Sequence, residues 1–77
     1  MPEFVVECQS DPQRGEVPVR FGWPSRMRIV VDLIDCWEGD DDVYFRIRAD
    51  DDATYILRRS RESGRWEIHF FRSRGPA

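Results

Sequence analysis

The sequence predicts an all-β fold, an antiparallel meander of five to six strands curled into a small open barrel-like sheet. Residues 43–48, 54–59 and 65–71 each alternate between apolar and polar side chains, which is typical of half-buried antiparallel strands. Short segments that are rich in Asp or contain Gly separate them, as in hairpins. A chain of 77 residues is expected to form a single domain, residues 1–77, and its 40% hydrophobic residues provide a core.

The first two strands are expected at residues 4–8 and 17–23, separated by a loop at residues 11–15. Pro18 and Gly22 interrupt the second strand, and both residue types are uncommon in a central strand. We therefore expect an edge strand or a bulged strand here. Its apolar side chains fall at odd positions, namely Val17, Val19, Phe21 and Trp23.

A third strand is expected at residues 26–37, after a chain reversal at Pro24. Its apolar side chains alternate at Met27, Ile29, Val31 and Leu33, and the alternation then breaks. A β-bulge or sharp bend at residues 32–35 explains that break. The alternative is a short helix over residues 29–37, since three apolar residues also recur there every four positions. The β-branched run at residues 29–31 favours the strand.

The hairpin between residues 43–48 and 54–59 has a predictable register, because large side chains of neighbouring strands must share a face. A three-residue loop at residues 50–52 pairs Ala49 with Ala53. Asp52 then occupies the position that requires a left-handed backbone, which Asp tolerates better than most residues.

The last hairpin pairs Ser60 with Arg65, and Gly64 takes the left-handed position of its turn. This register sets Phe70 opposite Tyr55 and extends a single apolar face across three strands. Its predicted members are Phe45, Ile47, Tyr55, Leu57, Trp66, Ile68 and Phe70.

The opposite face of these strands mixes Arg with aromatic residues and is the candidate partner-binding face. Arg58 lies opposite Glu67 in the predicted register, a favourable cross-strand pair. Such a face suits a protein partner, for which Tyr and Arg are favoured anchors, or single-stranded nucleic acid, whose bases stack on aromatic rings. Alternatively, the Arg stems simply cover the rings in water. The candidate residues are Tyr44, Arg46, Arg48, Arg58, His69 and Phe71.

The apolar face needs a cover, supplied by the first half of the chain or by a second copy. We expect a monomer in which the chain bends at residues 32–35, with a homodimer as the alternative. The covering side chains would be Val17, Val19, Phe21, Trp23, Met27, Ile29 and Val31.

The formal net charge of −3 argues against coating of nucleic acid or an anionic membrane by bulk charge. All 12 basic residues are Arg, a bias that pressure on codon composition explains without any selection for function. We therefore expect a small non-catalytic binding or regulatory module that acts through protein contact, with nucleic acid as the alternative partner. Salt dependence separates the two, because phosphate contacts weaken steeply with ionic strength.

No catalytic residue, metal site or cofactor is expected. Cys8, Cys36 and His69 cannot form a zinc quartet, and a Cys–His nucleophile pair has no motif around it. The acidic runs at residues 40–42 and 50–52 lack the spacing of a calcium-binding loop, so we interpret them as solvated turns.

The absence of a long apolar run and of a signal-like start leads us to expect a cytoplasmic protein with free thiols.

Several segments resemble a group of small uncharacterised bacterial proteins that share an Asp-x-Trp strand end, a Tyr-Phe-Arg-Val strand with an acidic turn, Tyr-Ile-Leu-Arg and Trp-x-Leu. The corresponding segments here are residues 27–37, 42–51, 54–58 and 66–68, within a similarity that covers residues 17–70. The chain departs from the group at Asp52 and Ala53, where such turns usually have Gly. The resemblance implies a small bacterial cytoplasmic β-domain and no activity.

Overall fold

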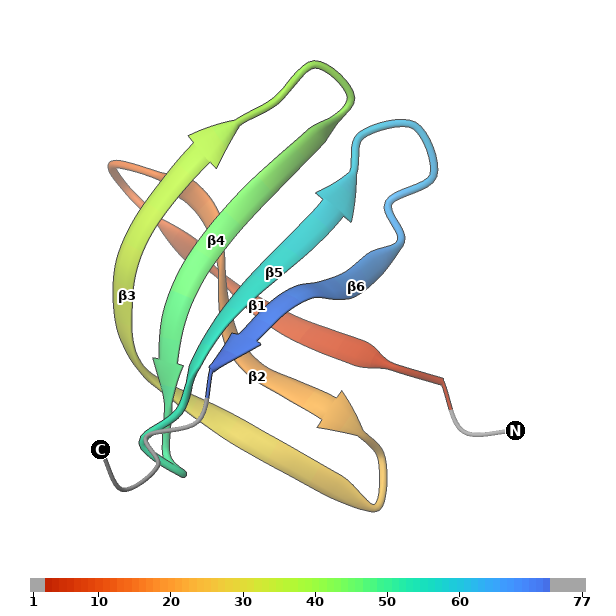
Figure 1. Cartoon of the computed structure of the whole chain (residues 1–77). Helices are drawn as coiled ribbons and strands as arrows, with labels where there is room; N and C mark the ends of the chain where they lie inside the picture. The colour runs from red at the N-terminus through yellow and green to blue at the C-terminus, as the bar shows by residue number, and fades with distance from the viewer. Residues whose placement is uncertain (1–2, 73–77) are drawn as a thin grey trace.

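The computed structural model describes residues 3–72, which form six antiparallel strands in one sheet with the order β1-β2-β3-β4-β5-β6 (Figure 1). The all-β meander is confirmed, and the helix considered for residues 29–37 is instead part of a strand. β1 and β6 are the two edges and do not pair, so the barrel stays open. None of residues 3–72 belongs to a helix long and apolar enough to cross a membrane. The strands are β1 (Val5–Asp11), β2 (Gly15–Trp23), β3 (Arg26–Glu38), β4 (Asp42–Ala49), β5 (Thr54–Ser60) and β6 (Trp66–Arg72).

The long strand β3 bends the sheet into two layers. Its residues 26–29 pair with β2, and its residues 30–38 pair with β4. The register shifts twice in the second part, between Val30 and Asp32 and between Leu33 and Asp35. Because β-bulges increase local bending and twist, β3 passes from one layer into the other and β1 crosses behind β4–β6 (Figure 1). The predicted bulge is confirmed.

The core lies between the two layers, on the side of β4–β6 that we call the inner face. Phe21 of β2 reaches the Tyr55 ring edge-on, with 4.7 Å between ring centroids, and Trp66 packs against Phe45 at 5.4 Å. The predicted inner face is therefore confirmed for all its members except Phe70. The buried core residues are Phe21, Phe45, Ile47, Ala49, Ala53, Tyr55 and Leu57.

The predicted cover from β2 and β3 is only partly correct. The turn at residues 24–25 pairs Trp23 with Arg26 and hence Phe21 with Arg28. Residues directly opposite each other share a face, so odd positions of β2 share a face with even positions of β3. Ile29 and Val31 are consequently 52% exposed, whereas Val30 packs against the core. β2 is bulged opposite Cys8 but is not an edge strand.

The β4–β5 turn has the predicted geometry. The Ala49 amide donates to the Ala53 carbonyl at 3.0 Å, and Asp52 has a left-handed φ of 67°. The Asp51 carboxylate accepts hydrogen bonds from the Ala53 amide at 3.0 Å and from the Tyr55 hydroxyl at 2.6 Å. Residues 50–52 thus serve a structural purpose, tying the turn to the core.

The β5–β6 register is correct as far as Ile68 and then changes. Leu57 pairs with Ile68, but Ile56 pairs with Phe70, so His69 is an extra residue on β6. Tyr55 therefore faces Phe71 rather than Phe70. The sequence predicts Phe70 on the inner face and Phe71 on the outer face, and both placements are wrong for the same reason. One inserted residue moves every later side chain of the strand to the other face of the sheet.

Candidate protein-binding surface

The solvent-facing side of β3–β6, opposite the core, carries most of the residues predicted to bind a partner; we call it the outer face. The strand registers arrange its side chains in three rows across the sheet. These are Trp37, Tyr44, Arg58 and Glu67; then Asp35, Arg46, Ile56 and Phe70; then Asp32, Arg48, Thr54 and Arg72.

A chain of stacked side chains crosses the outer face. The Trp37 and Tyr44 rings are parallel to within 5°, with 5.3 Å between centroids. The Arg46 guanidinium lies over the Trp37 ring at 5.6 Å, and His69 meets the Tyr44 ring edge-on at 5.2 Å. Because Arg and aromatic rings attract each other when stacked, Arg46 is held in place before any partner arrives.

The arginines of the outer face differ in whether they have an acidic partner. Arg58 pairs with Glu67, and Arg48 pairs with Asp52 at 3.3 Å. Within residues 3–72, Arg46 and Arg72 form no ion pair with a carboxylate. The outer face therefore combines neutralised arginines with two that remain available to a partner.

The two available arginines flank a hollow of about 430 Å³, whose lining also includes Thr54, Ile56 and Phe70. Phe70 is 47% exposed, although it is a large apolar residue. Ile34, which lies at the second bulge of β3, is also 47% exposed. Contiguous apolar patches with a polar rim are typical of protein interaction sites. Ile56 and Phe70, which lie opposite each other between the two arginines, form a small patch of this kind.

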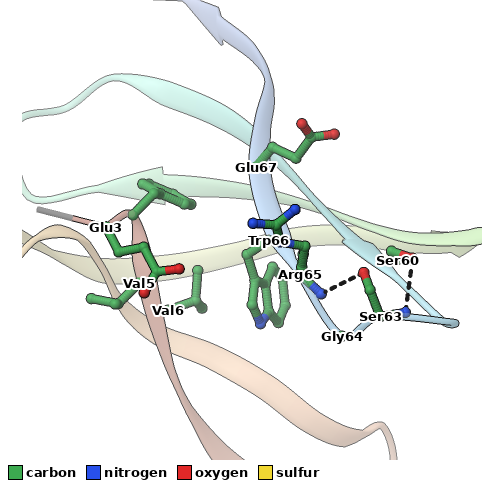
Figure 2. Close-up of a pocket in the computed structure, with 10 residues that line it drawn as sticks. Glu3, Val5, Val6, Ser60, Ser63, Gly64, Arg65, Trp66 and Glu67 are labelled. Carbon is green, nitrogen blue, oxygen red and sulfur yellow. Dashed lines mark hydrogen bonds between the residues drawn. The ribbon is translucent and has the colours of Figure 1, made fainter. Parts of the chain in front are cut away.

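A second groove, of about 800 Å³, lies between the two open edges of the sheet. Its walls are residues 3–6 on one side and residues 60 and 63–67 on the other, with Trp66 directed toward Val6 (Figure 2). The turn beside it is fixed by hydrogen bonds from the Ser63 amide to the Ser60 hydroxyl and from the Arg65 amide to the Ser63 hydroxyl, each 3.2 Å. None of the residues predicted to bind a partner lines this groove.

The thiols and the histidine do not form a common site. Cys36 packs against the core, whereas His69 contacts Tyr44 on the outer face. Burial raises the pKa of the Cys36 thiol, and burial followed by the nearby Glu16 carboxylate raises that of Cys8. Both changes disfavour the reactive thiolate. Residues 3–72 contain no group of three His, Cys, Asp or Glu side chains arranged to hold a metal ion.

Five of the six predicted partner-binding residues lie on the outer face, and Phe71 does not. Phe71 turns inward against Tyr55, with 4.8 Å between ring centroids. Sequence reasoning missed Trp37, Ile34, Phe70 and Arg72. In the sequence, only the break of alternation in β3 points to Trp37. That break shows that the side chains switch faces along the strand, but not how many times they switch.

Comparison with known proteins adds no residue to this surface. Neither a family model, nor a curated protein, nor a solved structure matches the chain.

Proposed function

We propose that this domain is a small non-catalytic binding module that contacts another protein through the outer face. The observation that carries the proposal is the exposed Phe70 packed with Ile56 between two arginines, on a face that also carries the stacked rings of Trp37 and Tyr44. A second exposed apolar residue, Ile34, lies on β3 at the opposite margin of the β3–β6 layer. Aromatic residues and Arg are the side chains most enriched among the residues that dominate protein interfaces.

Charge favours a protein over a polyanion as the partner. Two of the arginines on the outer face already neutralise carboxylates, and Asp32 and Asp35 lie opposite Arg48 and Arg46 in the β3–β4 ladder. The whole chain also has a net charge of −3. A surface that follows a phosphate backbone requires a clear excess of positive charge. The outer face is closer to balance, as a protein interface is.

The hollow between Arg46 and Arg72 suggests what the protein partner presents. Its apolar lining, Ile56 and Phe70, accommodates an apolar or aromatic side chain. A carboxylate next to that side chain would reach a guanidinium that has no acidic partner within residues 3–72. The expected partner segment is therefore an apolar residue flanked by Asp or Glu.

Single-stranded nucleic acid is the second candidate, and the stack of Arg46, Trp37 and Tyr44 favours it. Base stacking on an aromatic ring contributes about 1–3 kcal/mol per base. A titration with mixed-sequence single-stranded RNA and DNA, followed by amide NMR signals, tests it. Salt-sensitive changes at residues 37, 44–46 and 70–72 would favour nucleic acid over protein.

The protein-contact proposal is tested with two substitutions that are matched in chemistry and exposure. Ile34→Lys changes the exposed bulge residue next to Asp35 of the outer face, whereas Ile29→Lys changes the part of β3 that pairs with β2. Each folded variant is immobilised and exposed to cell extract at about 50 mM and 500 mM salt. A protein retained by the wild type and by Ile29→Lys at both salt concentrations, and lost with Ile34→Lys, supports the proposal. Equal retention by both variants, or no specific retention by the wild type, contradicts it.

A further inference from the structure

β6 is an edge strand that exposes two large apolar residues in succession. It pairs with β5 alone, so one side of its backbone is unpaired. Phe70 is 47% exposed on the outer face, and Phe71 is 52% exposed on the inner face. An edge strand with exposed apolar residues is a template for a further strand.

The bulge at His69 makes β6 complementary to itself. Glu67, Phe70 and Arg72 lie opposite outer-face residues of β5, and His69 touches the Tyr44 ring on that side. Ile68 and Phe71 lie opposite the buried Leu57 and Tyr55 on the inner face. Consider a second copy of β6 that runs antiparallel to the first, related to it by a two-fold axis between residues 69 and 70. In this arrangement outer-face residues lie opposite outer-face residues, and inner-face residues lie opposite inner-face residues.

We propose that a second copy of this chain pairs along β6 in this register and forms a symmetric dimer with a continuous sheet. Glu67 then lies opposite the partner's Arg72, and Ile68 opposite the partner's Phe71, with both contacts repeated by symmetry. His69 and Phe70 of the two copies meet at the axis, so the irregular part of each strand faces that of the other. Phe70 and Phe71 both lose exposure to water.

Charge complementarity selects a second copy as the occupant. Arg72 forms no ion pair within residues 3–72, and in this register it reaches the partner's Glu67. Glu67 already accepts from Arg58, but its second carboxylate oxygen can accept from another guanidinium. The two-fold axis produces two such Arg58–Glu67–Arg72 groups on the same surface.

The approach to this edge is open. The groove between β1 and β6 leaves space beside residues 65–67, at the start of this edge (Figure 2). Pairing of one short strand buries less than a standard interface of about 1,600 Å², so we expect a weak dimer with a dissociation constant of about 10 µM to 1 mM.

Two opposite charge reversals provide the test. Glu67→Arg gives a chain with Arg at both 67 and 72, and Arg72→Glu gives a chain with acidic residues at both. Each variant alone places like charges opposite each other twice, which should weaken dimerisation by about tenfold or more. An equimolar mixture restores both opposite-charge contacts and should dimerise again. Sedimentation equilibrium gives the mass, and amide NMR signals of residues 66–72 give the location.

Control substitutions change the same charges away from β6. Glu62→Arg in the β5–β6 turn and Arg26→Glu after the β2–β3 turn should dimerise like the wild type. Ile34→Lys should also dimerise like the wild type. The dimer and the proposed partner site share Phe70 and Arg72, whereas Ile34 lies on β3, so this variant separates a failure of one proposal from a failure of the other. A wild type that keeps the mass of one chain up to about 1 mM overturns the dimer proposal. Dimers that persist in both single variants, or a mixture that stays monomeric, overturn the proposed register.

Discussion

The inner and outer faces of β4 and β5 come from alternating residues of the same two strands, yet they have different physical roles. Phe45, Ile47 and Leu57 point inward and are almost completely buried. Tyr44, Arg46 and Arg58 point outward and interact mainly with rings and carboxylates at the surface. Burial of apolar area is the dominant favourable term in folding, so the inner face should determine stability. The outer face should then tolerate substitution and remain available for binding.

The largest expected effect is on the inner face, for Leu57→Ala. Leu57 is fully buried and faces Phe45 and Ile68 in the sheet. Loss of its side chain removes apolar contacts and leaves a cavity, which should cost about 3 kcal/mol of unfolding free energy. Urea denaturation measures that cost. Ile56→Ala, on the adjacent half-buried outer position, should cost less than half as much; equal costs would show that the two faces do not differ in this way.

Tyr55→Phe should have an intermediate effect, because it removes one polar contact at the border of the core. The Tyr55 hydroxyl donates to the Asp51 carboxylate at 2.6 Å. A hydrogen bond to a charged group contributes about 1.5–3 kcal/mol, and partial exposure of Asp51 places the expected loss near the low end. The control is Tyr44→Phe on the outer face, whose hydroxyl has no hydrogen-bond partner within residues 3–72.

The same contact should make stability depend on pH. Burial tends to raise the pKa of Asp51, but hydrogen bonds from Tyr55 and the Ala53 amide, with the charge of Arg28, outweigh it and lower that pKa below 3.8. A carboxyl group whose pKa is lower in the folded state stabilises that state at pH values above its pKa in the unfolded state. This stabilisation is lost as the pH falls through the pKa of the folded state. The difference between wild type and Tyr55→Phe should therefore shrink in acid. A difference that is constant from pH 7 to about pH 2 would contradict this.

A corresponding change is expected in alkali. Burial, the hydrogen bond to Asp51 and its negative charge raise the pKa of Tyr55 to about 12. A group whose pKa is higher in the folded state stabilises that state at pH values below its pKa in the unfolded state, which is 10.0 for Tyr. This stabilisation is lost as the pH rises through the pKa of the folded state. Phe at this position removes the ionisation, so the variant should lack this alkaline loss of stability.

The sequence was sufficient for the β4–β5 hairpin because every local signal agreed. Its alternation, the loop at residues 50–52 and the left-handed conformation of Asp52 all support one register, and the structure has that register. Agreement between local preferences and the global fold is what allows a register to be predicted. The outer positions Tyr44, Arg46, Arg48 and Arg58 followed from it directly.

Sequence signals were insufficient where two neighbouring residues could each occupy the buried position. Phe70 and Phe71 are both large and apolar, so alternation cannot decide which one faces Tyr55. The bulge at His69 decides it, and neither Gly nor Pro marks that bulge. For β3, two bulges in six residues place Trp37 on the outer face. A pattern of period two reports a change of phase but not the number of inserted residues.

The smallest expected effect belongs to the outer face, for Arg58→Gln, which keeps part of the side-chain stem and removes the charge. Arg58 pairs with Glu67, but both side chains are partly exposed, so water and salt screen the pair. Exposed ion pairs typically contribute up to about 1 kcal/mol, and we expect a loss of about 0.5 kcal/mol in urea denaturation. A loss as large as that of Leu57→Ala would mean that the outer face holds the fold together. It would then be a poor candidate for a surface that evolution could adapt to a partner.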